Sequence, residues 1–333
     1  MERVKKTKNN RGMRDEENNE MKINVGVLGC GSWGTNHVRV LNELDCANLI
    51  GVADIDPKRA KIIGTKYNID YYSDYSKLIE RKDIQLLNVC TPTVTHAEIA
   101  LEAIKTGKNV LVEKPMTNTV QEAKELITSA RHHGVKIMVG FIERFNPAVT
   151  KTEELLKKRE IGEIVLASSK RVTRRPLRIG DVGVIKDIAI HDIDLIRYIF
   201  GKKVKQVYAV AGNISHTFED YANIVMRFED KRSAFVEANW LTPRKVRRLI
   251  ITGTEGIIQV EYIKQEVTVE KQELMYTPFF NKNEPLKLEL QHFLNSIIQE
   301  EIPVPSGEDG LETLKICEAA LKSAKTGHPV NIE

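Results

Sequence analysis

Residues 23–34 read INVGVLGCGSWG, an apolar run that leads directly into three spaced glycines. A G-x-G-x-x-G turn between a strand and a helix is the fingerprint of dinucleotide binding. Gly29 permits the tight turn, Gly31 lets the backbone approach a pyrophosphate at the helix N-terminus, and Gly34 lets helix and strand pack closely. The turn therefore supplies five candidate cofactor-binding residues: Gly29, Gly31, Ser32, Trp33 and Gly34.

The end of the second predicted strand indicates which dinucleotide is bound. Asp54 follows Gly34 by 20 residues, where a carboxylate accepts hydrogen bonds from the ribose hydroxyls of NAD and repels the 2′-phosphate of NADP. We therefore expect NAD rather than NADP. Arg59 stays a candidate cofactor residue because an arginine near this ribose accommodates a 2′-phosphate, although it is also interpreted as a solvated helix residue.

Short apolar runs alternate with segments of helical period over the first half of the chain. Strands are predicted at Ile23–Leu28, Leu49–Asp54, Leu86–Cys90, Asn109–Glu113 and Lys136–Gly140, with helices at about 33–44, 57–66, 74–81, 94–106 and 119–132. This order is typical of βαβ units in a doubly wound parallel sheet. We assign residues 21–143 to a Rossmann α/β domain and 1–20, which hold almost no apolar residues, to a disordered tail.

The pattern changes in the second half. Helices are predicted at about 147–158 and 187–200, followed by long strands at 204–214, 220–229, 232–242, 246–252, 256–262 and 266–272 and by helices at about 285–300 and 308–326. Tight turns between the strands favour antiparallel hairpins. Residues 144–333 are therefore assigned to an α+β domain for substrate binding and oligomerisation, with a large open, mainly antiparallel sheet.

Composition excludes several classes of protein. The 333 residues carry 50 Lys+Arg against 46 Asp+Glu, and this formal charge of +4 is too small and too mixed to indicate nucleic-acid binding. No apolar run approaches the roughly 20 residues that cross a bilayer, and no secretory signal is apparent, so we expect a cytoplasmic protein without a membrane partner. The four cysteines lack the spacing of a disulfide framework or a zinc site, and no metal is expected.

Polar residues lie at the ends of the third and fourth predicted strands. Thr91 and Pro92 end one strand and lead to His96, and the next strand ends in Glu113 and Lys114. Ligands of open α/β sheets lie at these carboxyl ends. These five residues are therefore candidates for cofactor binding, and Lys114 also for holding or polarising a substrate hydroxyl.

A second cluster stands in the predicted helix at 187–200. Asp187 and His191 are four residues apart, so an α-helix places them on one face, and Asp194 follows three residues after the histidine. Taken alone, such a pair is also compatible with a surface hydrogen bond. Two residues are too few for a metal site.

Taken together, three segments resemble the glucose–fructose oxidoreductase, inositol dehydrogenase and rhizopine catabolism (Gfo/Idh/MocA) family: GVLGCGSWG with VADID, the stretch CTPTVTHAEIALEAIKTGKNVLVEKPM, and DIAIHDID. The resemblance extends over about 22–326 and implies an NAD(P)-dependent oxidoreductase. It further implies that Lys114 and His191 flank the alcohol carbon facing the nicotinamide, with Asp187 binding or polarising the substrate. We take neutral His191 as the base and Lys114 as the group that orients the oxygen, although the family leaves this division open.

A basic run just before the second cluster bears on the substrate. Five cations fall between positions 170 and 178, and a loop there would suit phosphate; a solvated loop or an oligomer contact is the alternative. RRPLRIGDVGVIKDIAIHDIDLIRYI resembles the branch that oxidises UDP-N-acetylglucosamine at C3, whose 3-keto product is then transaminated. The proposed phosphate contacts are Arg171, Arg174, Arg175 and Arg178, and Arg144 and Asn146, after the last Rossmann strand, are candidate sugar-nucleotide contacts or structural residues.

Two other functions stay open. One is an inositol or free-sugar dehydrogenase of the same family, and the other is a non-catalytic, NAD-binding redox sensor. The presence of Lys114, Asp187 and His191 argues against a sensor, which needs no acid–base residues. A homodimer or homotetramer is expected, because one face of the predicted open sheet is left without helices.

Overall fold

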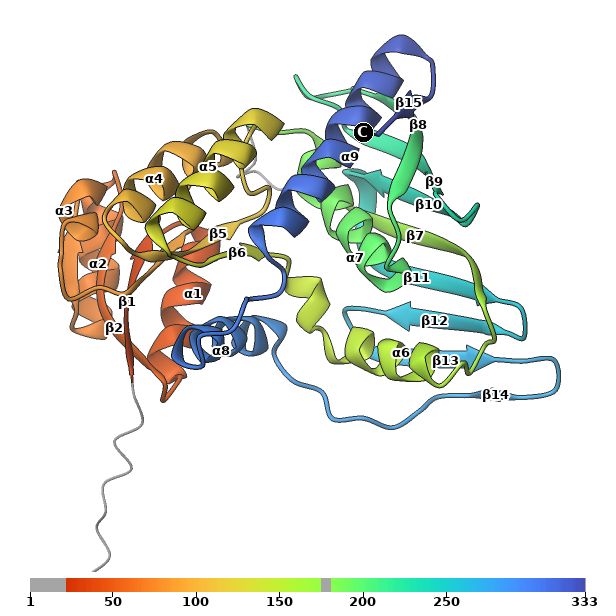
Figure 1. Ribbon diagram of the computed structural model, residues 1–333, viewed down its shortest axis with the longest axis horizontal. Coiled ribbons are helices and arrows are strands. Elements are labelled where there is room, and N and C mark those ends of the chain that lie inside the picture. The colour runs from red at the N-terminus through yellow and green to blue at the C-terminus, as the bar shows by residue number, and fades with distance from the viewer. Residues whose placement is uncertain (1–21, 175–180, 333) are drawn as a thin grey trace, which may run out of the picture.

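The computed structural model describes residues 22–174 and 181–332. Within them the first domain is built on a six-stranded sheet of order β3-β2-β1-β4-β5-β6, with every neighbouring pair parallel (Figure 1). Its strands are β1 (Ile23–Leu28), β2 (Ala47–Ala53), β3 (Asp70–Tyr72), β4 (Leu86–Val89), β5 (Asn109–Glu113) and β6 (Ile137–Gly140). The connecting helices are α1 (Ser32–Glu43), α2 (Pro57–Tyr67), α3 (Tyr75–Ile79), α4 (Thr93–Lys105) and α5 (Val120–His133).

This order reverses direction between β1 and β4, which is where open α/β sheets bind their ligands. Strands β1, β4 and β5 are buried along almost their whole length, as expected for a parallel sheet covered on both faces. The predicted doubly wound Rossmann domain is confirmed.

The second domain begins with a 3₁₀ turn at Ile142–Phe145 and α6 (Pro147–Lys157), followed by β7 (Ile164–Arg174). A π-helical turn at Ile185–Ala189 then leads directly into α7 (Ile190–Phe200). The remaining elements are β8 (Val204–Gly212), β9 (Tyr221–Phe228), β10 (Ser233–Asn239), β11 (Leu241–Gly253), β12 (Ile257–Glu261), β13 (Glu266–Glu270), β14 (Met275–Tyr276), α8 (Pro285–Ile298), α9 (Gly307–Thr326) and β15 (Val330–Asn331).

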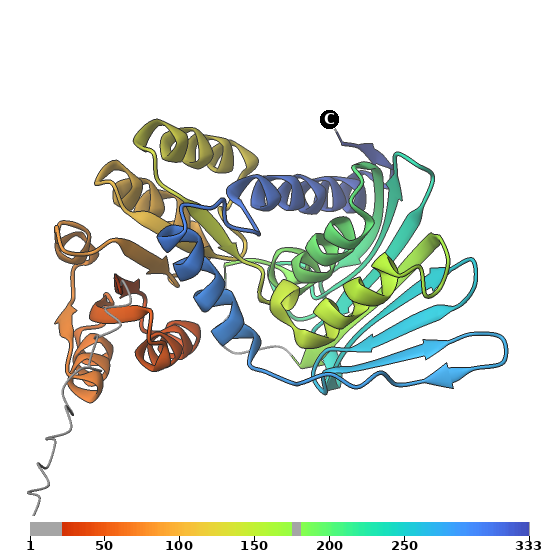
Figure 2. The same ribbon diagram turned by 60° about the horizontal axis from the view of Figure 1, so that its bottom comes forward.

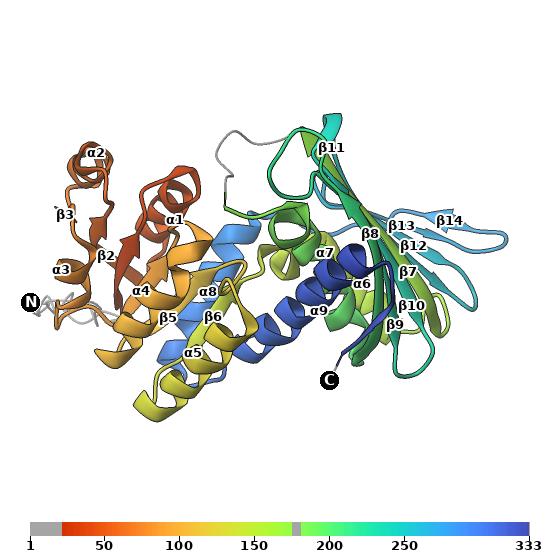
Figure 3. The ribbon, with the colours of Figure 1, turned by 90° about the horizontal axis from the view of Figure 1, so that it is seen from above.

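In the described part of the chain, these strands form one nine-stranded sheet of order β14-β13-β12-β11-β7-β10-β9-β8-β15. Only β7 and β10 pair in parallel. Helices α6, α7 and α9 cover one face, and Figure 3 shows no helix on the other. The predicted open, mainly antiparallel sheet is thus confirmed.

One sequence-based expectation in this domain was wrong. The basic run was expected to be a loop from Lys170 onward, but residues 170–174 form the end of β7, between β10 and β11. The helix expected at about 187–200 is present as α7, preceded by a π-helical turn that begins at Ile185. Charge in the basic run masked the alternation of buried and exposed positions that marks the strand.

Helix α8 returns to the first domain. Its Leu286, Leu290, Phe293 and Leu294 are buried together with residues of β1, β4 and α1. Figures 1 and 2 show the helix lying beside α1, between the two sheets. The two domains therefore share a continuous apolar interface, although α8 comes late in the chain.

Candidate functional site

The glycine turn at the end of β1 has the geometry that a pyrophosphate needs. Gly29 has a φ of +95°, and a Cβ there would lie 2.7 Å from the carbonyl oxygen of Cys90. A Cβ on Gly34 would lie 1.8 Å from the carbonyl oxygen of Gly29, so the close packing predicted there is confirmed. A Cβ on Gly31 would meet no atom within 4 Å, and no side chain caps the amides of α1. The turn is therefore open to an anion.

Asp54 is fixed against this turn. Its Oδ2 accepts from the amide of Cys30 at 2.7 Å, and its Oδ1 accepts from the amide of Asp56 at 2.8 Å. Each carboxylate oxygen can accept further hydrogen bonds, as ribose recognition requires. Arg59 is 61% exposed and pairs with Asp56 at 3.4 Å, so it lies at the surface beside this position.

A buried network holds the end of β5 against α1. The carboxylate of Glu113 accepts from Trp33 Nε1 and contacts His37 Nε2 at 3.0 Å, while His37 Nδ1 lies 3.0 Å from the side-chain amide of Asn88. Burial alone would raise the pKa of Glu113, but His37, Lys114 and Trp33 together hold it below its usual value. Trp33 and Glu113 are thus held in place by the hydrogen bond between them.

His96 braces two strand ends. The ring is 1% exposed, and its nitrogens lie 2.9 Å from the carbonyl oxygens of Pro115 and Thr91. Because both nitrogens face backbone, His96 fixes the loops that follow β4 and β5. Thr91 and the exposed Pro92 form the loop that it holds.

Lys114 joins the two domains at the predicted site. Its ammonium donates to the backbone oxygen of Asp187 at 2.6 Å and to Oδ1 of the same residue at 2.9 Å. The side chains are 15% and 7% exposed, respectively. A second link lies nearby, where Asp181 accepts from the amide of Thr93 at the start of α4 at 2.8 Å. The structure therefore brings the strand-end lysine and the D-x-x-x-H segment together.

His191 lies in the same place, in the first turn of α7. Burial, followed by the charges of Lys114, Arg171 and Arg247, lowers the pKa of His191 well below its ordinary value. The imidazole is therefore neutral near pH 7. Nδ1 is buried without a partner among the described residues, whereas Nε2 does not belong to the buried atoms that lack a partner. A neutral imidazole can accept a proton.

The arginines proposed as substrate contacts are placed differently from the expectation. Arg171 is 2% exposed, and its guanidinium donates to Asp192 through Nε and Nη2 and to Glu143 through Nη1 at 2.8 Å. Tyr262 completes this buried cluster by donating to Asp192 at 3.4 Å. Since all these hydrogen bonds are internal, the structure gives Arg171 a role in the core.

Arg144 and Asn146 also have internal partners. Arg144 is 8% exposed and donates to both carboxylate oxygens of Asp194, at 2.7 and 2.6 Å. Asn146 is 2% exposed and caps α6 by accepting from the amide of Ala148. These contacts support the structural reading of both residues. Arg174 is exposed at the end of β7, while Arg175 and Arg178 lie outside the described residues.

Comparison with known proteins supplies the family. Residues 23–141 match the model of the oxidoreductase family's NAD-binding Rossmann fold, and residues 153–332 match that of its C-terminal alpha/beta domain. The chain belongs to the Gfo/Idh/MocA family. It is therefore an oxidoreductase whose first domain binds NAD, and the open glycine turn and Asp54 fit that cofactor.

Related proteins of the family are named for different functions. An uncharacterized oxidoreductase YrbE of Bacillus subtilis is 30% identical, over 93% of this chain and 97% of its own. The myo-inositol 2-dehydrogenase of Thermotoga maritima is 28% identical, over 93% and 99%. The structure of UDP-N-acetylglucosamine 3-dehydrogenase GnnA from Acidithiobacillus ferrooxidans has a TM-score of 0.85 at 24% identity, covering 92% of this chain and 98% of its own. That last likeness shows the shared fold.

Sequence reasoning missed several residues of this Gfo/Idh/MocA site. Glu143, Asp192 and Arg247 surround His191 or its neighbours and come from three separate segments of the chain. Asp192 stands in the quoted segment DIAIHDID but was given no role, and no local motif marks Glu143 or Arg247. Asp181 was quoted as part of the basic run without a role. The available signal for Asp181 was its place in the sequence DVG, just before the D-x-x-x-H segment.

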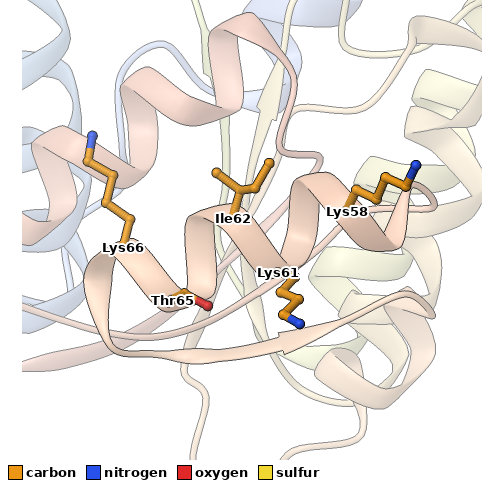
Figure 4. A pocket seen from close by; sticks show the side chains of 5 residues that line it. All are labelled: Lys58, Lys61, Ile62, Thr65 and Lys66. Atoms are coloured by element: carbon orange, nitrogen blue, oxygen red, sulfur yellow. The ribbon is translucent and has the colours of Figure 1, made fainter.

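An open hollow lies elsewhere, over α2 (Figure 4). It is lined by Lys58, Lys61, Ile62, Thr65 and Lys66, all from that one helix. None of the acid–base residues contributes to it, so we do not connect it with the chemistry. Among residues 22–174 and 181–332, no cluster of metal-ligating side chains is found, and no helix is long and apolar enough to cross a membrane.

Proposed function

We propose that this protein uses NAD to oxidise a secondary alcohol of a sugar, with UDP-N-acetylglucosamine oxidised at C3 as the favoured reaction. The observation that carries the proposal is the meeting of Lys114, Asp187 and neutral His191 beside the cofactor domain. Such a set suits alcohol oxidation, which requires a base for the hydroxyl proton and a cation for the developing alkoxide. A redox sensor would need neither.

Lys114, Asp187 and His191 have separate roles in the proposed reaction. Lys114 donates to the alcohol oxygen, and Asp187 keeps the ammonium directed through its carboxylate and its backbone oxygen. His191 takes the hydroxyl proton on Nε2 as the C–O bond becomes a carbonyl. The hydride acceptor would be NAD, held by the glycine turn after β1 and by Asp54. The products are the ketone, NADH and a protonated histidine, which returns its proton to solvent.

Two observations favour a nucleotide sugar over a free one. The run at 174–199 resembles the UDP-N-acetylglucosamine branch, and exposed cations near the C-terminal end of β7, such as Arg174 and Arg244, suit phosphate. The competing proposal is an inositol dehydrogenase, which the Thermotoga maritima relative supports.

Initial rates of NADH formation with UDP-N-acetylglucosamine, UDP-glucose, myo-inositol and glucose separate these proposals. We expect the highest kcat/KM with UDP-N-acetylglucosamine. A higher value with myo-inositol would replace the nucleotide-sugar proposal with the polyol one. No turnover of any alcohol, together with tight NAD binding, would favour the sensor.

We further propose that the uncovered face of the nine-stranded sheet joins copies of the chain. Tyr208, Val225 and Phe235 lie side by side on β8, β9 and β10, because the strand register pairs Tyr208 with Val225 and Val225 with Phe235. They are 40%, 42% and 39% exposed, respectively. A contiguous apolar row on an uncovered sheet face favours association.

A further inference from the structure

Two arginines face each other on neighbouring strands next to His191. Arg247 of β11 is paired in register with Arg171 of β7, so both side chains leave the same face of the sheet. That face carries α7. Arg171 is 2% exposed, whereas the side chain of Arg247 is 31% exposed. One guanidinium is thus enclosed and the other reaches the edge of the cluster.

A single carboxylate holds the two charges together. Glu143 Oε1 accepts from Arg171 Nη1 at 2.8 Å and from Arg247 Nη1 at 3.1 Å. Its Oε2 lies 3.2 Å from the side-chain amide of Asn146. Arg171 has Asp192 as a second acceptor, but Nε and Nη2 of Arg247 have no acceptor within the described residues. Arg247 therefore keeps two hydrogen-bonding positions free.

The carboxylates around Arg247 do not fully offset its burial and the neighbouring charge of Arg171. Burial and then Arg171 lower the pKa of Arg247, and Glu143, Asp192 and Asp187 offset this only in part. Arg171 and Arg247 lower the pKa of Glu143 against the effect of burial, so the two cations share this one carboxylate. An additional anion at the free side of Arg247 would relieve the repulsion between the two guanidinium groups.

Arg247 acts electrostatically on the residues that we place beside the reacting carbon. Its charge acts on His191 and on Asp187, the residues placed beside the alcohol. A phosphate attached to the carbon two bonds from the oxidised one would reach the same part of the site. The planar fork of an arginine binds phosphate oxygens in a bidentate manner.

We propose that Arg247 binds a phosphate oxygen of the substrate's nucleoside diphosphate. From the sequence, this role was predicted for the arginines of the basic run. The inference rests on the proposed function for the identity of the substrate. It assigns substrate discrimination to β11, and it assigns to Glu143 and Arg171 the positioning of that arginine.

The test uses the full chain with Arg247→Gln and Arg247→Lys, and Arg248→Gln as the matched control. Arg248 is the next residue on β11, is 65% exposed and pairs with Glu261 on the opposite face. Two quantities are measured: the Kd of UDP for the NADH-bound protein by calorimetry, and the steady-state constants for UDP-N-acetylglucosamine and myo-inositol.

We expect Arg247→Gln to raise the Kd of UDP and the KM for UDP-N-acetylglucosamine by about tenfold or more, because a charge-assisted contact is lost. The KM for neutral myo-inositol should rise much less than the KM for UDP-N-acetylglucosamine, because myo-inositol carries no phosphate. The Kd of UDP and the KM for UDP-N-acetylglucosamine of Arg247→Lys should lie between those of the glutamine variant and those of the unaltered protein. The lysine variant keeps the test valid if the glutamine variant does not fold. Arg248→Gln should behave as the unaltered protein.

The outcomes separate this inference from the proposed function. An unchanged Kd of UDP in both Arg247 variants, or an equal loss with myo-inositol, would overturn the inference alone. If the unaltered protein oxidises only polyols but binds UDP through Arg247, the proposed substrate is wrong and the phosphate contact stands. If the unaltered protein does not bind UDP at all, both are overturned.

Discussion

Replacing Arg171 with methionine distinguishes a core residue from a substrate contact. Among the described residues, the change leaves Asp192, which is fully buried, with only the 3.4 Å contact from Tyr262, while Glu143 keeps Arg247 and Asn146. Removing one partner from a buried ion pair costs about 3–5 kcal/mol. Stabilities of whole proteins are about 5–15 kcal/mol, so this loss is a large part of the total.

At about 2–4 °C of Tm for each kcal/mol, the expected fall in Tm is on the order of 6–20 °C. Thermal unfolding of Arg171→Met is followed by circular dichroism at a fixed protein concentration, with Arg174→Gln as the exposed control from the same strand. The control should melt within about 2 °C of the unaltered protein, because exposed substitutions have small effects. An unchanged Tm for Arg171→Met combined with a raised KM for the UDP-sugar would refute the core assignment and restore the phosphate role.

Three further predictions concern the cofactor, the acid–base residues and assembly. Asp54→Ala should narrow the preference for NAD over NADP, measured as the ratio of their dissociation constants; a parent protein that already prefers NADP would contradict the role of Asp54. Lys114→Ala and His191→Ala should each lower kcat by roughly a hundredfold or more, with the Kd of NAD nearly unchanged. Since the pKa of His191 is lowered, the neutral base persists below pH 6.5, and the acid limb of the kcat profile of the unaltered protein should fall below that value; a limb above it would count against His191 as the base. Phe235→Asp should shift the sedimentation coefficient toward the monomer, whereas an unaltered protein that is already monomeric at micromolar concentration would overturn the sheet-face interface.

The first domain could be read from the sequence because its signals are local. Gly29 and Gly34 stand at positions where a side chain would collide with backbone, and Asp54 follows at the end of the next strand. Each of these requirements concerns one turn of the chain. The pattern therefore predicted the doubly wound parallel sheet and the cofactor, although not the short strand β3 (Asp70–Tyr72).

The arginines could not be read in the same way, because their roles depend on distant partners. Arg171 was interpreted as a phosphate contact in a loop, yet Asp192 and Glu143 neutralise it inside the protein. The partners come from a helix and a 3₁₀ turn that are 21 and 28 residues away. Composition alone gives a basic run the same appearance whether it is solvated or buried. Arg247 went unnoticed for the related reason that its importance arises only from strand register.

The return of α8 to the first domain limits how this enzyme can be recombined. A chain cut after the last Rossmann strand would expose Leu86, Leu111 and Met138, which α8 helps to bury. A chimera that exchanges the cofactor domain with that of another family member must therefore carry α8 with the Rossmann segment or redesign the apolar surface beneath it. The order of segments along the chain therefore does not match the structural units. A boundary chosen from sequence position alone does not mark an exchangeable module.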